Sequence, residues 1–271
     1  MRVFAIKDEE LTSILAYLLY YEQAKSFYIE LPDDADPWET PLLLSSFLKR
    51  GEHTVNAYWS RMWVQQRIIP SDRQNLGQIL KANGLDEYDE FKLLMLSNGR
   101  CAQDNCYLEE ITPDEIPDEL TKRGAKKIED VIPLAERHLL VFFRDGMVRK
   151  CSIMPFAKDN PALAPVLRSD DIFRSVAVQT DGYGIRWSEQ AVIDNAALYR
   201  ASVEIPFSLN DFCSFIANRV VNSTEAVEML GCSRQNIDDL TKRGKLHPIR
   251  VDTRNTLFLK NEIQQSGDRK L

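Results

Sequence analysis

Near its N-terminus the chain has two runs rich in aliphatic and aromatic residues, Ile14 to Tyr21 and Ser26 to Leu31. Apolar runs of this length, bounded by turn residues, are typical of β-strands. Pro32 ends the second run because proline cannot donate a ladder hydrogen bond. The sequence therefore predicts a pair of neighbouring strands.

Helical spacing follows these runs. In the segment Asp72 to Asn83 apolar residues recur at i, i+3 and i+4, and Gly84 stands where a C-terminal cap is expected. The segment Asp86 to Ser97 repeats this spacing. Trp59 and Trp63 lie four residues apart, which indicates one face of a further helix. Core packing is the default role for that face, and a partner-binding aromatic patch is the alternative.

An acidic stretch with two prolines, residues 111–124, is predicted to be a linker. The region after it is mainly strand-like. Leu139 to Phe143 leads through Arg144-Asp145-Gly146 into Met147 to Ile153, and Asp-Gly between two such runs is a strong hairpin signal. Short runs around Gly182 and Gly184, Val176 to Val178 and Ile185 to Trp187, predict two more strands.

The last seventy residues return to helical spacing, with a helix predicted over Leu209 to Val220. Asn222 and Glu225 form a capping box that opens the next helix, which ends at Leu230. Gly231 then makes a tight turn. Ser233 caps a second short helix, since its side chain can accept a backbone N–H of the first turn.

Gly244 is expected to end this second helix as a left-handed cap. Beyond it, Pro248 to Val251 and Thr256 to Leu259 alternate like the two strands of a hairpin. The expected fold is α+β and multidomain. Its parts are an α+β domain (1–110), the linker (111–124), a sheet-containing domain (125–201), a connecting helix (202–221) and a winged helix-turn-helix (222–271).

Charge is distributed unevenly along the chain. The net charge is −7, yet the stretch from Arg219 to Lys260 holds eight Lys and Arg against five Asp and Glu, a local charge of +3 that leaves −10 for the remainder. An acidic body with a basic end is typical of a protein in which only that end contacts phosphates.

Composition also indicates the cellular compartment. Apolar runs stay well short of the roughly 20 residues of a membrane span. The acidic first residues are unlike a signal peptide. The five cysteines are odd in number and scattered, which suits unpaired thiols in a reducing cytoplasm. We therefore expect a cytoplasmic protein.

The predicted second helix of the pair places polar side chains outward when Ile237 and Leu240 point inward. Arg can pair with guanine and Gln with adenine through two hydrogen bonds each. Arginines near the hairpin tip suit a phosphate or the minor groove. The candidate DNA-contacting residues are Ser233, Arg234, Gln235, Asn236, Asp238, Lys242, Arg243, Lys245, Arg250 and Arg254.

The segment Ser223 to Ile237, followed by Arg243-Gly244-Lys245-Leu246, resembles the winged helix-turn-helix of the excisionase and MerR families. The resemblance implies binding of double-stranded DNA, usually by paired protomers, so a homodimer is expected. This chain departs from the pattern at Asp238-Asp239. Acids there can accept from cytosine or repel phosphate.

Two other regions resemble known families. The strand-like runs near the N-terminus, with Leu42 to Leu48 and Tyr88 to Leu94, resemble the N-terminal subdomain of HipA-type toxin kinases. The kinase body is absent, so this resemblance implies a HipA-like kinase as a partner in a toxin-antitoxin system. Val131 to Leu134 and His138 to Gly146 are similar to the small domains called domain of unknown function 2442.

An enzyme needs converging acids, bases or nucleophiles. His53 and His138 have no such partners in the sequence, and Cys101 and Cys106 have no nearby histidine to complete a zinc site. We therefore expect no catalysis, no metal and no cofactor. Two function classes stay open: a sequence-specific transcriptional regulator, and a protein-interaction module or inhibitor whose C-terminal helices bind protein.

Overall fold

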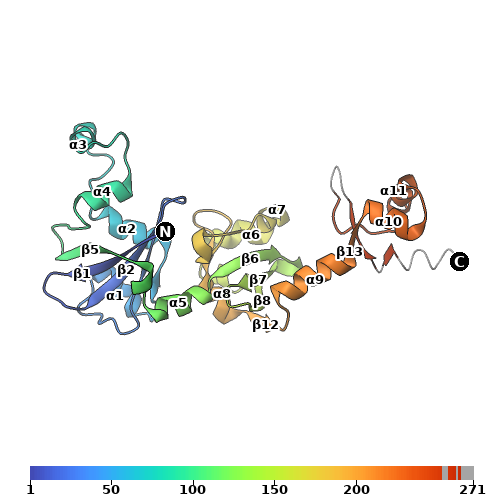
Figure 1. Cartoon of the computed structure of the whole chain (residues 1–271), viewed down its shortest axis with the longest axis horizontal. Coiled ribbons are helices and arrows are strands. Elements are labelled where there is room, and N and C mark those ends of the chain that lie inside the picture. The colour runs from blue at the N-terminus through green and yellow to red at the C-terminus, as the bar shows by residue number, and fades with distance from the viewer. Residues whose placement is uncertain (252–255, 261, 264–271) are drawn as a thin grey trace. The chain divides into compact units, whose positions relative to one another are not determined.

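The computed structural model describes residues 1–251, 256–260, 262 and 263. The chain folds as two compact units, residues 1–145 with 149–204 and residues 146–148 with 205–271. Several small sheets and short helices make up these units, which confirms the α+β class (Figure 1). In the described part of the chain, no helix is long and apolar enough to cross a bilayer.

The first unit begins with a five-stranded antiparallel sheet in the order β4-β3-β2-β1-β5. The predicted strand pair is confirmed as β2 and β3, which pair from Tyr17–Glu30 to Tyr21–Ser26. The charged ends of β1 and β5 interrupt their apolar pattern, so neither strand was predicted. The strands are β1 Arg2–Asp8, β2 Ile14–Tyr21, β3 Ser26–Glu30, β4 Thr54–Val55 and β5 Cys106–Ile111.

Three helices contribute to the apolar cluster on one face of this sheet. Leu44, Trp63 and Leu94 pack there against strand residues such as Leu18 and Ile29. Trp63 is fully buried in this core, whereas Trp59 on the same helix stays 42% exposed. The helices of this region are α1 Leu42–Leu48, α2 Ala57–Gln65, α3 Leu76–Ala82 and α4 Glu90–Leu96.

Helices α3 and α4 begin four residues later than predicted. The start of α4 is set by Asp89, whose side chain accepts the backbone N–H of Lys92 at 3.0 Å. Asp86 was expected to open this helix. Because the first-turn N–H groups need an acceptor, the acid that reaches them decides where the helix begins.

The opposite face of the first sheet is buried as well. Tyr17, Leu19 and Tyr28 contact Leu120 and Tyr183 there. The rings of Tyr28 and Tyr183 stack with centroids 3.7 Å apart and planes 9° apart. A strand buried on both faces has no reason to alternate polar and apolar residues, which explains the continuous apolar run of β2.

The predicted linker instead contains a docked helix, α5 (Asp118–Ala125). The features taken for a linker, Pro117 followed by Asp118 and Glu119, are also those that favour a helix N-terminus. Leu120 is 7% exposed and packs on the first sheet. The helix is thus part of the first unit's core.

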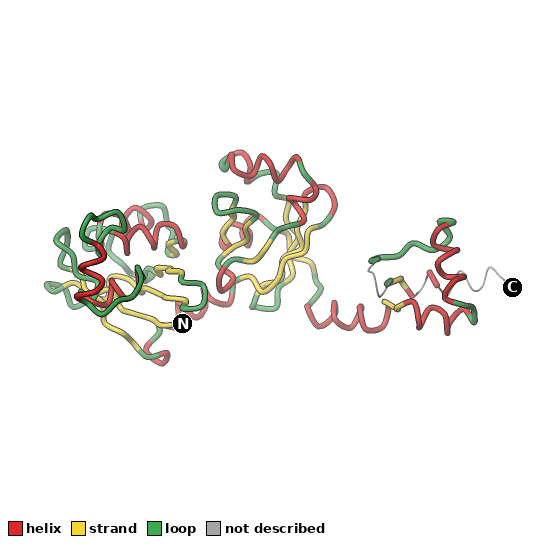
Figure 2. The backbone as a smooth tube through the Cα atoms, turned by 90° about the horizontal axis from the view of Figure 1, so that it is seen from above, coloured by secondary structure: helices red, strands yellow, loops and turns green. Residues whose placement is uncertain are grey.

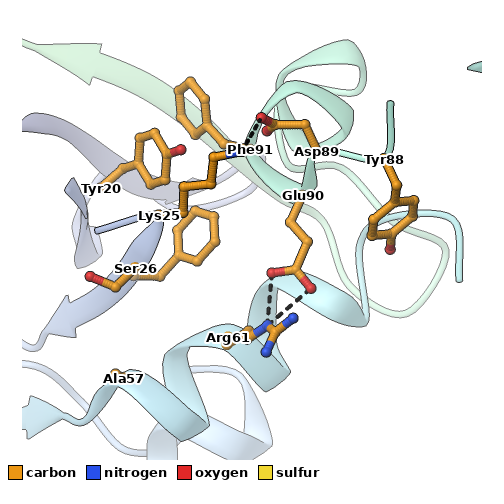
Figure 3. Close-up of a pocket in the computed structure, with 10 residues that line it drawn as sticks. Tyr20, Lys25, Ser26, Ala57, Arg61, Tyr88, Asp89, Glu90 and Phe91 are labelled. Carbon is orange, nitrogen blue, oxygen red and sulfur yellow. Dashed lines mark hydrogen bonds and ion pairs between the residues drawn. The ribbon is translucent and has the colours of Figure 1, made fainter. Parts of the chain in front are cut away.

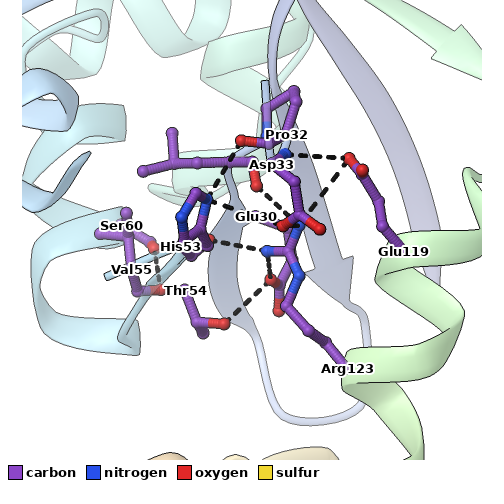
Figure 4. Close-up of polar contacts among 10 residues, drawn as sticks. Glu30, Pro32, Asp33, His53, Thr54, Val55, Ser60, Glu119 and Arg123 are labelled. Atoms are coloured by element: carbon purple, nitrogen blue, oxygen red, sulfur yellow. Dashed lines mark hydrogen bonds and ion pairs between the residues drawn. The ribbon is translucent and has the colours of Figure 1, made fainter. Parts of the chain in front are cut away.

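Arg123 of α5 makes a network of polar contacts with the first sheet (Figure 4). Its guanidinium donates to the Glu30 carboxylate at 2.8 Å, to Leu31 O at 2.7 Å and to His53 O at 3.0 Å. Thr54 Oγ1 also donates to Glu30, at 2.9 Å. Burial raises the pKa of Glu30 above its usual range, although Arg123 and Thr54 act in the opposite direction.

Two small sheets complete the first unit, in the orders β12-β8-β7-β6 and β11-β10-β9. The predicted hairpin around Gly146 is confirmed as β7 and β8, and the two predicted later strands are confirmed as β9 and β10. The strands are β6 Ile128–Pro133, β7 His138–Phe143, β8 Val148–Ser152, β9 Ala177–Val178, β10 Gly184–Arg186, β11 Val192–Asp194 and β12 Val203–Ile205, and the helices are α6 Ala164–Arg168, α7 Asp170–Arg174 and α8 Asn195–Ala201.

Gly182 allows a close backbone approach next to Tyr183. Its φ is +76°, and a Cβ there would lie 2.2 Å from Ile128 O. Beside it, the Asp181 carboxylate accepts from Lys127 Nζ at 2.5 Å and from the Tyr21 hydroxyl. Burial alone would raise the pKa of Asp181, but the hydrogen bonds from Lys127 and Tyr21 lower it below its usual range.

The second unit is small (Figure 2). A connecting helix was predicted over Leu209 to Val220 and is confirmed as α9 (Leu209–Arg219). After it come β13 (Val220–Asn222), α10 (Ser223–Leu230), α11 (Arg234–Lys242) and β14 (Leu257–Leu259).

Replacing Arg123 with Met is expected to lower the free energy of unfolding of the first unit by about 3 kcal/mol, because Glu30 is left as a buried charge without its main partner. The matched control, Lys122→Met, removes an exposed charge from the same helix and should change stability by less than about 0.5 kcal/mol. Urea unfolding measures both.

The loss in Arg123→Met should be larger at pH 8 than at pH 5. A carboxyl whose folded-state pKa is raised favours the fold at low pH, and that contribution disappears as pH rises through the folded-state pKa. Equal urea midpoints for the two variants at pH 8 would show that the Arg123 network contributes nothing.

Candidate nucleic-acid interface

Helix α10 begins where the sequence predicted, at a capping box. The side chain of Asn222 accepts the N–H groups of Thr224 at 2.8 Å and Glu225 at 3.0 Å. In return, Glu225 Oε2 accepts the N–H of Asn222 at 2.8 Å. These reciprocal bonds satisfy the first-turn donors and set the helix start.

Two residues, Gly231 and Cys232, separate the end of α10 from the cap of α11, and Gly231 has left-handed backbone. Gly231 has φ +58° and ends α10, and Ser233 then opens α11 by accepting the N–H of Asn236 at 3.3 Å. Gly244 follows α11 at φ +64°. Both glycines stand where a Cβ would be strained, so the turn between the helices and the end of the second one are set locally.

The two helices and β14 share one small core. Ala226 of α10, Ile237 of α11 and Phe258 of β14 are each at most 1% exposed. Val221, Leu246 and Ile263 complete this buried cluster. Because Ile237 occupies the inner side of α11, the orientation of that helix is determined by its packing.

The predicted hairpin after α11 is present only in part. Ile249 N and Leu257 O are 2.8 Å apart, and Arg250 forms an isolated bridge with Leu257. The main partner of β14, however, is β13, which precedes α10 and was not predicted as a strand. The alternation predicted that the apolar residues Ile249 and Val251 would face inward. They are instead exposed by 53% and 71%.

The predicted contact residues fall into groups. Arg234, Gln235, Asp238 and Lys242 are all exposed on α11. Helical spacing places Gln235 and Lys242 on the side away from Ile237, with Arg234 and Asp238 on its flanks. Arg243, Lys245 and Arg250 are exposed beyond the helix. Ser233 acts as a cap, Asn236 is half-buried, and Arg254 lies outside the described residues.

This arrangement offers guanidinium, amide and ammonium donors on one surface, with one carboxylate among them. Such donors suit phosphate oxygens and the acceptor edges of bases. Asp238 stands within the same face, three residues from Gln235 and four from Arg234. The face can therefore bind an anionic ligand with donors while placing one acceptor, or one repulsive charge, at its centre.

A cavity of about 380 Å³ lies in the first unit (Figure 3). Tyr20, Phe27 and Phe91 give it aromatic walls. Its cations already have partners: Arg61 Nε is 2.9 Å from a Glu90 oxygen, and Lys25 is 4.0 Å from Asp89. Neither cysteine nor histidine is among the residues that line it.

Among the described residues, no group of three or more His, Cys, Asp and Glu side chains is placed to hold a metal ion. Cys106 is buried, and burial raises the pKa of its thiol to about 12, so it is protonated at neutral pH. The nearby Cys101 Sγ lies 3.7 Å from Asp104 Oδ1.

Comparisons of this chain with protein-family models, with curated proteins and with solved structures find no match.

Replacing Ile237 with Ala should destabilise the second unit by about 3 kcal/mol, because it leaves a void in a core of only a few residues. Amide hydrogen exchange in α10 should then become roughly a hundredfold faster. Gln235→Ala, an exposed position on the same helix, should leave the exchange rate unchanged. Similar rates in both variants would contradict the packing of α11 on α10.

Proposed function

We propose that the chain is a sequence-specific DNA-binding transcriptional regulator that contacts double-stranded DNA through a winged helix-turn-helix built from α10, α11 and the residues that follow. Helix α11 enters the major groove, with Arg234 and Gln235 near its N-terminal end against base edges. One observation carries the proposal: α11 buries Ile237 on one side, exposes Gln235 and Lys242 on the other, and exposes Arg234 at its N-terminal end.

Exposed cations beyond α11 support contact with the DNA backbone. Arg243, Lys245 and Arg250 are all exposed. Phosphate contacts supply affinity that does not depend on sequence, whereas base contacts supply specificity. The local charge of +3 within a chain of net charge −7 favours approach of DNA to this end.

Affinity at a specific site requires more than one copy. The nine residues of α11 present only a few base-contacting side chains, and single small modules bury little surface on DNA. Two protomers on one site double these contacts, so the proposed functional form is a homodimer.

A second candidate function is protein binding, and the first unit has an observation in its favour. Trp38, Tyr58 and Trp59 are exposed by 87%, 66% and 42%. Exposed tryptophan and tyrosine are typical of binding hot spots. A HipA-like kinase is the proposed partner, which would make the chain an antitoxin-like regulator; a pull-down with such a kinase, repeated with Trp38→Ala, tests it.

The purified chain should retard selected duplex DNA in a mobility-shift assay, and its affinity should fall steeply between 50 and 200 mM salt as counterions are released. Gln235→Ala should relax the sequence preference recovered from a randomised duplex pool, whereas Arg250→Ala should weaken binding to all sequences alike. Lys92→Ala removes an exposed charge from the first unit and serves as the control. Absence of binding at 50 mM salt would overturn the proposal.

Replacing Asp238 with Asn should strengthen DNA binding about threefold at low salt, because it removes a negative charge within several ångströms of the phosphates. Glu228→Gln makes the same charge change at an exposed position of α10, outside the proposed contact face, and should have a smaller effect. If Asp238→Asn instead weakens binding to one sequence only, Asp238 accepts a hydrogen bond from cytosine.

A further inference from the structure

Helix α9 carries an apolar stripe along one side. Leu209, Phe212, Cys213 and Ile216 follow one another at i, i+3, i+4 and i+7, which places them on a common face. Phe215 lies at the edge of this face. We call these five residues the α9 stripe.

The α9 stripe is accessible although the helix is well built. A capping box opens α9, in which Ser208 and Asp211 satisfy each other's backbone N–H groups, with Asp211 N to Ser208 Oγ at 3.1 Å. None of the residues of α9 is buried, and Phe215 and Ile216 are exposed by 46% and 43%. Exposed aromatic and aliphatic side chains in one row mark an interaction surface.

We propose that the α9 stripe binds the α9 stripe of a second copy of this chain, with the two helices antiparallel. The proposal deepens the proposed function and rests on it, since it names the surface that joins the two DNA-binding protomers. An antiparallel pair has two-fold symmetry, so each copy uses the same surface.

The charge pattern of α9 favours a second copy over another partner. The stripe contains no ionised side chain, and Arg219 lies on the same face at its C-terminal end. The polar residues Asp211, Ser214 and Asn218 lie together on the opposite side of the helix. Asp211 is already engaged in the capping box. A partner must therefore offer an uncharged apolar row of similar length, and an identical stripe meets this requirement.

The spacing of the stripe suits a two-fold axis near Ser214. Phe212 then lies opposite Ile216 of the second copy, and the aliphatic stem of Arg219 lies opposite Leu209 of the second copy. At 1.5 Å per residue, the two Cys213 residues are offset by about 3 Å along the helix axis, across a helix separation of about 8–10 Å.

The position of α9 in the chain gives this pairing a consequence for DNA. Strand β13 follows α9 directly, and its three residues are all that separate the end of α9 from Ser223, where α10 begins. Pairing of two α9 helices therefore brings two α11 helices into one assembly. The spacing of the two half-sites on DNA then depends on this short connection.

Thiol cross-linking of the full chain tests the geometry. Cys213 is exposed, Cys106 and Cys151 are buried, and Cys101 and Cys232 are replaced by serine to leave one accessible thiol. A short bismaleimide should link most of the chain into covalent dimers through Cys213. Moving the thiol to the polar side, with Cys213→Ser and Asn218→Cys together, should abolish the cross-link. Equal cross-linking at both positions, or none at Cys213, would overturn the proposal.

Sedimentation separates this inference from the proposed function. The chain should sediment as a dimer, Ile216→Glu as a monomer, and Asn218→Glu as a dimer, with DNA affinity reduced at least tenfold in Ile216→Glu alone. A monomeric wild-type chain, or a dimer that survives Ile216→Glu, overturns the α9 pairing. If the wild-type chain is a dimer that Ile216→Glu dissociates, but the wild-type chain binds no DNA, the pairing is supported and the proposed function is wrong.

Discussion

The first sheet is buried on both faces, and the architecture of the first unit depends on how the second face is covered. Helices α1, α2 and α4 supply the residues that pack on one face, as helices commonly do in α+β domains. Leu120 and Tyr183 cover the other, and the stacked rings of Tyr28 and Tyr183 are the closest aromatic contact there. Gly182, with its close approach to Ile128, is what allows Tyr183 to reach this position.

Covering that face also buries ionisable groups, and each of them needs a partner. Glu30 is 4% exposed and is satisfied by Arg123 and Thr54, while Lys127 and Asp181 satisfy each other. A buried charge that lost its partner would be costly. Hydrogen bonds and ion pairs depend on direction, whereas apolar contacts do not. These pairs therefore fix the position of the covering residues on the sheet.

The second unit is organised by different means. Its core is a handful of residues around Ile237 and Phe258, and its helix boundaries are set by side-chain caps at Asn222 and Ser233 rather than by extensive burial. A small domain of this kind leaves most of its side chains exposed. One side of α11 and the α9 stripe are among the exposed surfaces of this unit.

The sequence by itself determined those features that depend on neighbouring residues: the β2–β3 pair, the turn at Gly146, the capping box at Asn222 and the outward placement of Gln235. Each follows from hydrogen bonds or periodicity within a few residues. Only the tertiary structure decided the role of residues 111–124 and the pairing of β13 with β14. The same proline and acids suit a linker or a helix start, and the contact of Arg123 with the distant Glu30 belongs to the helix. Strand β13 likewise forms only because folding brings Phe258 and its neighbours beside it.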